Sequence, residues 1–124
     1  MIVNIDLGVV ETLVDLASQA HPKETVMILE GSNRKGEIKV TGVLFQQYSA
    51  NENSTHFNLD LPMGTKSVGT FHSHPGPSNR PSQADLKLFE KFGLVHFIAH
   101  YPYRIEDFAC YDKMGTRVPF SVSN

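Results

Sequence analysis

Cysteine is almost missing from this chain of 124 residues, since Cys110 is the only one. A single cysteine cannot form an intrachain disulfide, and it excludes a structural zinc site built on several thiolates. Any metal ion must therefore be held by nitrogen and oxygen ligands. Cys110 itself lies in a stretch that we predict to be a buried strand, so we interpret its thiol as a small apolar core group and not as a nucleophile.

Runs of like charge and long apolar runs are missing too. Lysine and arginine number 11 against 13 acidic residues, and the basic residues are scattered from Lys23 to Arg117. The sequence therefore gives no electrostatic indication of nucleic-acid or anionic-membrane binding. No apolar stretch approaches the roughly 18 residues of a membrane span, and the N-terminus lacks the pattern of a signal peptide. We expect a cytoplasmic protein.

What the sequence does contain is typical of one globular domain. The apolar fraction is 40% and the charged fraction 19%, and no repeat, low-complexity tract or linker divides the chain. We therefore predict a single domain over residues 1–124.

Apolar periodicity predicts two main helices. The first begins at Leu7, with Asp6 placed to cap it, and ends at His21-Pro22. The second begins at Ser82 and continues to Phe92, with Gly93 after it as a C-terminal stop. A turn is expected over residues 31–36, and strands over residues 2–5, 25–29, 38–48, 67–72, 95–101, 105–111 and 117–122. This pattern indicates an α/β sandwich, with a mixed β-sheet flanked by the two helices.

Two histidines and an aspartate stand out between residues 70 and 85. His72 and His74 are two residues apart at the end of an apolar strand, so both imidazoles project from the same face. Four proline and glycine residues follow within seven positions and require a turn that can bring Asp85 back to the histidines. Two imidazoles and one carboxylate commonly hold zinc with a fourth position open for water, whose pKa the ion lowers.

Each of these residues also has a simpler interpretation. Ser82 and Asp85 have the spacing of a helix capping box, and His72 and His74 could be a hydrogen-bonded pair at a strand end. Their joint occurrence around a proline-fixed turn favours the metal site. In that interpretation the Ser82 hydroxyl is a candidate donor to an oxyanion.

The spacing His72-x-His74, seven residues to Ser82 and two more to Asp85 resembles the JAMM motif of MPN-domain metalloproteases, and the chain is most similar to the minimal archaeal members. The resemblance implies a cytidine-deaminase-like JAB1/MPN fold and one Zn²⁺ with a bound water. It implies that His72, His74 and Asp85 are the zinc ligands and that Ser82 is the oxyanion donor. Relatives also carry a glutamate after a His-Pro pair, which matches Glu24 and implies that Glu24 is the catalytic acid/base.

Glu30 is the competing acid, but it lies six residues further along an extended run in which each residue advances roughly 3.3 Å, so it is too distant to reach the same water. The remaining histidines lack ligand spacing and are interpreted as structural or surface residues, although a strand-end histidine such as His100 can also face an active site. They are His21, His56, His96 and His100.

The family resemblance implies hydrolysis of the isopeptide bond between the C-terminal glycine of a ubiquitin-like protein and a lysine. Such a tail could pair with a strand edge, and we expect residues 49–66 to form the wall of its groove. Two alternatives stay open: a peptidase that trims the C-terminus of a sulfur-carrier protein, and a non-catalytic MPN-type scaffold, which the complete ligand set disfavours. A zinc nucleobase deaminase would need a pair of cysteine ligands that this chain lacks.

Overall fold

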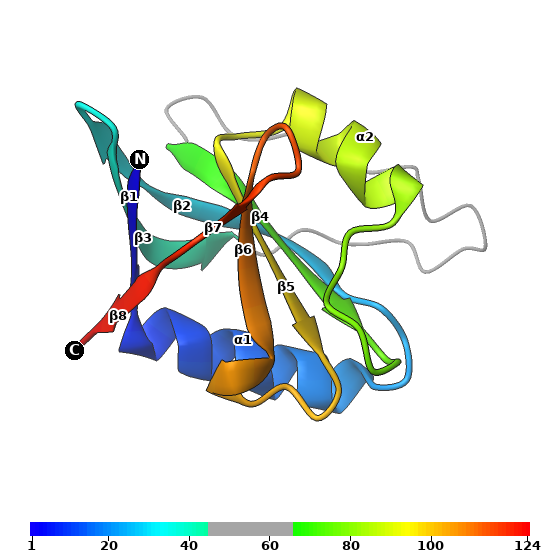
Figure 1. Cartoon of the computed structure of the whole chain (residues 1–124). Helices are drawn as coiled ribbons and strands as arrows, with labels where there is room; N and C mark the ends of the chain where they lie inside the picture. The colour runs from blue at the N-terminus through cyan, green and yellow to red at the C-terminus, as the bar shows by residue number, and fades with distance from the viewer. Residues whose placement is uncertain (45–65) are drawn as a thin grey trace.

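A mixed β-sheet runs through the middle of the molecule, and the structure, a computed structural model, describes residues 1–44 and 66–124. Among these residues the sheet has eight strands in the order β7-β6-β5-β4-β2-β3-β1-β8 (Figure 1). The elements are β1 (Ile2–Asp6), α1 (Leu7–Ala20), β2 (Val26–Arg34), β3 (Glu37–Leu44), β4 (Ser67–His74), α2 (Gln83–Lys91), β5 (Val95–His100), the short 3₁₀ helix η1 (Ile105–Asp107), β6 (Phe108–Asp112), β7 (Arg117–Val118) and β8 (Ser121–Ser123).

Strand directions alternate irregularly across this sheet. β4 and β5 are parallel, as are β1 with β3 and β1 with β8, whereas β2 is antiparallel to both β3 and β4. β6 is antiparallel to β5 and to β7. The parallel pair β4–β5 is connected through α2, as a crossover requires. The predicted fold, a mixed sheet flanked by two helices, is confirmed.

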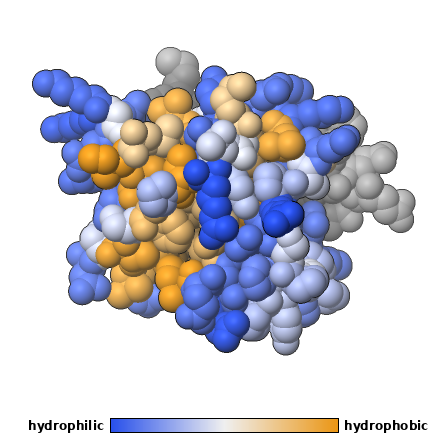
Figure 2. Space-filling view, in the orientation of Figure 1, coloured by the Kyte–Doolittle hydropathy of each residue, from blue (hydrophilic) through white to orange (hydrophobic). Residues whose placement is uncertain are grey.

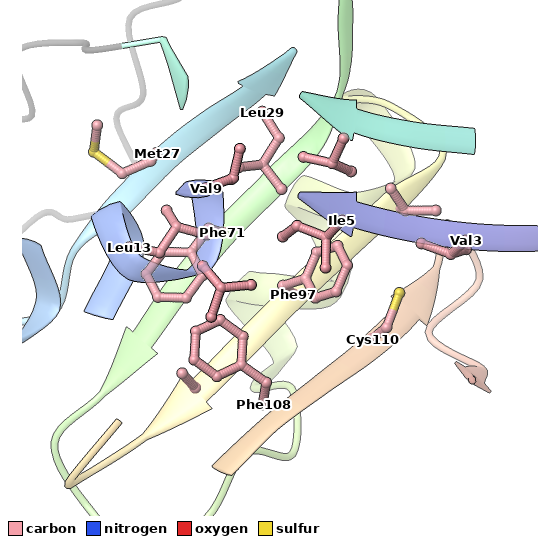
Figure 3. Close-up of a cluster of buried hydrophobic side chains, with 14 of the residues drawn as sticks. Val3, Ile5, Val9, Leu13, Met27, Leu29, Phe71, Phe97, Phe108 and Cys110 are labelled. Atoms are coloured by element: carbon pink, nitrogen blue, oxygen red, sulfur yellow. The ribbon is translucent and has the colours of Figure 1, made fainter. Parts of the chain in front are cut away.

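The two helices cover opposite faces of the sheet (Figure 1). α1 buries Val9, Val10, Leu13 and Ala17 in the main apolar core, together with Phe71, Phe97 and Phe108 of the central strands (Figure 3). α2 contributes Phe89 to a smaller apolar cluster with Ile98, Ala109 and Tyr111. The α2 face is therefore the less apolar of the two, and the candidate site lies on it.

The start of α1 differs from the expectation in one respect. Asp6 occupies the N-cap position, but its side chain makes no capping hydrogen bond. Ser123 Oγ of the neighbouring strand β8 lies 3.5 Å from Asp6 Oδ1. The predicted cap is therefore wrong, because this carboxylate faces the C-terminal strand.

The hairpin between β2 and β3 is tighter than predicted. β2 continues to Arg34, and only Lys35 and Gly36 form the turn, with φ values of 53° and 81°. Such a two-residue turn matches the twist of the strands that it joins. Gly31 marks a β-bulge in this strand instead of the turn, and a Cβ there would lie 1.8 Å from the Lys39 carbonyl oxygen.

The C-terminal strands are shorter than predicted. Residues 105–107 form η1 because the Asp107 carboxylate accepts from the Arg104 backbone N–H at 2.9 Å, which favours a helical turn. The expected strand over 117–122 is divided into β7 and β8 around Pro119, which has no backbone N–H for a ladder. The predicted continuation of the strand to residue 48, His56 and most of the proposed groove wall lie outside the described residues.

The surface in the orientation of Figure 1 is divided by hydropathy. Figure 2 shows apolar residues gathered toward the side on which the two termini lie, and hydrophilic residues on the lower right. Ile2 of β1 and Val122 of β8 are among the exposed large apolar side chains. In the part of the chain that the structure describes, neither helix is long and apolar enough to cross a membrane.

Candidate metal centre

The end of β4 carries both histidines of the motif on the α2 face of the sheet. β4 extends to His74, two residues beyond the predicted end, so His72 and His74 lie on one regular strand. His72 is buried and packs against the Phe89 ring of α2 in a T-shaped arrangement, whereas His74 is less enclosed. The rigid strand therefore fixes the relative positions of the two imidazoles, as the spacing predicts.

Asp85, in the first turn of α2, meets both histidines. His72 Nδ1 lies 3.3 Å from Asp85 Oδ1, and His74 Nε2 lies 3.0 Å from Asp85 Oδ2. Burial alone would raise the pKa of Asp85, but the hydrogen bond from His74, the charge of His72 and the bond from the Ser82 backbone lower it to about 2. The carboxylate is therefore ionised at neutral pH.

Ser82 and Asp85 also form the capping box that the sequence allows. The Asp85 backbone N–H donates to Ser82 Oγ at 3.1 Å, and the Ser82 N–H donates to Asp85 Oδ2 at 2.9 Å. The box fixes the carboxylate that faces the histidines, so capping and metal binding are compatible roles. Because Ser82 Oγ acts as an acceptor here, its proton remains available to another group.

The donor set fits zinc. Tetrahedral ligands about 2.0–2.2 Å from a zinc ion lie about 3.3–3.5 Å from one another, close to the His72–Asp85 separation and somewhat longer than the His74–Asp85 separation. Over residues 1–44 and 66–124, however, no three histidine, cysteine or acidic side chains are already gathered as a completed metal site. Asp85 is hydrogen-bonded to His74 and lies 3.3 Å from His72 Nδ1, and metal bonds would replace these contacts.

Glu24 lies at the same end of the sheet, two residues before the start of β2. The Thr25 backbone N–H donates to Ser73 Oγ at 2.8 Å, and the Ser73 N–H donates to the Thr25 carbonyl at 2.9 Å. These bonds extend the β2–β4 register, in which Val26 pairs with His72, and place Glu24 beside His74. Partial burial raises the pKa of Glu24, the charge of His74 opposes this, and Asp85 adds to it.

Glu30 is at the opposite end of the β2–β4 pairing. It lies opposite Ser67, the first residue of β4, whereas the histidines are at the last residues. The expectation that Glu30 is too distant from the site is confirmed.

Two residues of the site were not identified from the sequence as part of it. Thr70 Oγ1 lies 2.9 Å from His72 Nε2 and 2.6 Å from Nδ1 of His96, which was interpreted only as a structural residue. Burial lowers the pKa of His72 to about 4 and that of His96 to about 3, so both imidazoles are neutral at pH 7. Strand alternation indicated that Thr70 shares a face with His72, but the position of His96 depends on the β4–β5 register.

The remaining described histidines and Cys110 have other surroundings. His21 Nδ1 lies 2.8 Å from the Tyr103 hydroxyl, and its ring stacks on Tyr101. His100 pairs with Asp107 at 3.4 Å, although its backbone lies beside His74. Cys110 is fully buried, and burial raises the pKa of its thiol to about 12. Its interpretation as a core residue is therefore confirmed.

Comparisons with known proteins agree with this architecture. A family model described as prokaryotic homologs of the JAB domain matches residues 7–111. A probable metalloprotease from Haloferax volcanii is 31% identical over 92% of this chain and 75% of its own.

Solved structures agree over nearly the whole chain. The crystal structure of a JAB1/MPN domain protein from Archaeoglobus fulgidus is 36% identical, covers 98% of this chain and 99% of its own, and gives a TM-score of 0.79. A structure described as a JAMM metalloprotease-like zinc site in the proteasome and signalosome is 33% identical over the whole of both chains, with a TM-score of 0.72. The chain therefore belongs to the prokaryotic JAB family, whose members have the JAB1/MPN fold and include JAMM-type metalloproteases.

Proposed function

We propose that this protein is a zinc-dependent isopeptidase that cleaves the amide bond between the C-terminal glycine of a ubiquitin-like protein and a lysine. One observation supports this most strongly: three potential zinc ligands from β4 and α2 converge, and Glu24, two residues before β2, lies beside them. Family membership supports metalloprotease chemistry with a protein substrate.

His72, His74 and Asp85 would hold the zinc ion. They supply two imidazole nitrogens and one ionised carboxylate oxygen, a ligand set typical of catalytic zinc. When bound, zinc supplies Lewis-acid polarisation of the substrate carbonyl and lowers the pKa of water. The Ser82 backbone N–H donates to the Asp85 carboxylate and so orients this ligand, as supporting hydrogen bonds do around many metal ions.

Glu24 is proposed as the acid/base group. In the hydrolysis, its carboxylate accepts a proton from the attacking water and then returns it to the leaving lysine amine. Its raised pKa brings it closer to the range in which a carboxyl can both accept and release a proton near neutral pH. The strand-like pairing of Thr25 with Ser73 holds it on a rigid part of the fold.

Ser82 is proposed to stabilise the oxyanion. Its hydroxyl oxygen accepts the Asp85 N–H, so its hydrogen is free to donate to the carbonyl oxygen that becomes negative. Ser82 is exposed, which leaves this donor accessible to a substrate.

The substrate would bind as an extended C-terminal tail. A glycine-ended tail is narrow and can pair with a strand edge. The proposed groove wall over residues 49–66 remains a prediction, because almost all of it lies outside the described residues.

The decisive experiment compares Glu24→Gln with Glu30→Gln, two identical changes near opposite ends of the β2–β4 pairing. The purified proteins are incubated with a lysine-linked ubiquitin-like conjugate and, separately, with a sulfur-carrier protein that has an extra C-terminal residue. We expect Glu24→Gln to lose about 100- to 10,000-fold in turnover, the usual range for acid/base groups, while it keeps its zinc. Glu30→Gln should cleave like the unmodified chain.

Other results would redirect the assignment. Near-normal turnover by Glu24→Gln would remove Glu24 from the mechanism. Cleavage of the carrier protein alone would replace the isopeptidase with the trimming peptidase. Zinc binding without cleavage of either substrate would favour the scaffold.

A further inference from the structure

A chain of polar contacts runs from the candidate metal ligand His72 into the interior below α2. His72 Nε2 lies 2.9 Å from Thr70 Oγ1, and Thr70 Oγ1 lies 2.6 Å from His96 Nδ1. Thr70 and His96 are both fully buried. The other nitrogen of His72, Nδ1, faces Asp85. These contacts therefore join the metal site to a histidine that no proposed catalytic step uses.

The single proton of the Thr70 hydroxyl limits how these contacts can be arranged. A hydroxyl between two imidazole nitrogens donates to one and accepts from the other. If it donated to His72, then His96 Nδ1 would carry the proton and His96 Nε2 would be a bare acceptor. His96 Nε2 is buried and makes no hydrogen bond among the described residues, so it does not compete for the Thr70 proton.

The two distances indicate the direction of these hydrogen bonds. A hydroxyl donor makes a shorter bond than an N–H donor, and the contact of Thr70 Oγ1 with His96 Nδ1 is the shorter of the two. His96 therefore carries its proton on Nε2, and the Thr70 hydroxyl donates to His96 Nδ1 over the short 2.6 Å distance. Thr70 Oγ1 must then accept from His72, which places the His72 proton on Nε2.

We propose that Thr70 and His96 are positioning residues that fix His72 with Nε2–H directed at Thr70 and with the Nδ1 lone pair free to ligate zinc. The proposal rests on the zinc site proposed above and assigns the ligand atom within it. A lone pair at Nδ1 facing an ionised carboxylate at 3.3 Å requires a cation between them, which is what a zinc ligand set provides.

The Phe89 ring holds this arrangement in place. It stacks on His96 with ring centroids 4.1 Å apart and planes 9° from parallel, and it packs against His72 with centroids 5.6 Å apart and planes at 66°. The ring planes of both histidines are therefore set by packing, so neither imidazole can readily turn to exchange its nitrogens.

The first test uses two substitutions at Thr70 that differ in the hydroxyl. Thr70→Val has nearly the same shape without the hydroxyl, and Thr70→Ser keeps it. We expect Thr70→Val to weaken zinc binding about 10- to 100-fold in a competition assay with a chelator, the usual loss when a supporting hydrogen bond to a ligand is removed. Thr70→Ser should bind zinc nearly as tightly as the unmodified chain. Equal zinc affinity in all three proteins would overturn the proposal.

The second test needs no substitution and so does not depend on a variant that folds. In ¹⁵N NMR spectra of the zinc-loaded, histidine-labelled protein, His72 should show a protonated Nε2 and a metal-bound Nδ1. A Cd²⁺-loaded sample should show ¹¹³Cd coupling to His72 Nδ1. Coupling to His72 Nε2 would overturn the proposal, because Thr70 would then have no N–H to accept.

These outcomes can be separated from failure of the proposed function. If zinc binds through His72 Nδ1 but no conjugate is cleaved, the positioning role stands and the isopeptidase assignment fails. If conjugates are cleaved while His72 ligates through Nε2, the function stands and the role of Thr70 and His96 fails.

Discussion

The two faces of the central sheet use the same strands for different purposes. On β4, Phe71 points into the α1 face, while Thr70 and His72 point into the α2 face. On β5, Phe97 joins the α1 core, while His96 lies under α2. Strand alternation alone therefore separates apolar packing from polar chemistry within one residue.

The contents of the two faces differ accordingly. The α1 face is built from aliphatic and aromatic side chains, many of them shown in Figure 3. Among the described residues, the α2 face has a smaller apolar cluster of four buried residues, next to the buried polar residues Thr70, His72, Asp85 and His96. Buried polar groups stabilise a fold only when they are paired, so we attribute most of the stability to the α1 face and the reactivity to the α2 face.

Truncating one phenylalanine on each face tests most directly whether stability and zinc binding depend on different faces. Phe71→Ala should lower the free energy of unfolding by about 3–5 kcal/mol, because it opens a cavity in the main core. The folded fraction should still bind zinc normally. Phe89→Ala should also destabilise the protein, but here the zinc affinity of the folded fraction should fall, because the ring orders His72 and His96.

Denaturant titration and chelator competition on the same samples measure both quantities. If Phe71→Ala weakened zinc binding of the folded protein as much as Phe89→Ala, the two faces would not be separable.

Ser82 allows capping to be separated from catalysis. Ser82→Ala should lose about 100- to 1000-fold in turnover as an oxyanion donor, and about 1 kcal/mol of stability as an N-cap. Ser82→Gly should show the same loss of turnover with a stability change of only a few tenths of a kcal/mol, because glycine is tolerated at an N-cap. Kinetics and thermal unfolding of both variants test this, and normal turnover in Ser82→Gly would exclude the oxyanion role.

The α2 face should make the zinc-free protein sensitive to acid. The folded-state pKa values of His72, about 4, and His96, about 3, lie below the usual value of 6.5, so the unfolded chain binds more protons between these values. The free energy of unfolding should therefore fall as pH decreases from 6.5 toward 4, and Asp85 should add a further loss between about 4 and 2.

His96→Asn should flatten this dependence by an amount on the order of a few kcal/mol between pH 6.5 and 4, because one group no longer titrates. Urea unfolding at a series of pH values, with a chelator present, measures the slope. An unchanged slope would show that His96 is not held neutral by the fold.

Two glycines on either side of the histidines should respond differently to an added methyl group. A Cβ on Gly69 would lie 1.6 Å from the Val95 carbonyl oxygen, so Gly69→Ala must push β4 and β5 apart. We expect a loss of about 1–3 kcal/mol, typical of overpacking. Gly76, in the loop after the histidines, has no other atoms within 4 Å of an added Cβ, so Gly76→Ala should leave the midpoint of thermal unfolding nearly unchanged.

Much of this molecule could be predicted from the sequence. Period-2 and helical patterns indicated both helices and most of the strands, and the prolines after His74 indicated the return to Asp85. The alternatives at Ser82 and Asp85 are not exclusive in the structure, because one carboxylate both caps the helix and faces the histidines.

What could not be predicted depends on pairing between distant strands. Gly31 begins a stretch of turn-forming residues in the sequence. Only its pairing with β3, where the Lys39 carbonyl lies against it, shows that it is part of a β-bulge. His96 is an ordinary strand histidine until the β4–β5 register places it opposite Thr70. Register is set by packing across the whole sheet, which local sequence does not record.

The zinc content of three purified proteins tests the central claim most directly. His74 and His100 are register partners on adjacent parallel strands, yet only His74 faces Asp85. We predict about one zinc per chain in the unmodified protein and in His100→Gln, and almost none in His74→Gln, because a catalytic zinc needs three protein ligands. Zinc retained by His74→Gln, or absent from the unmodified protein, would contradict the assignment of the α2 face as the metal site.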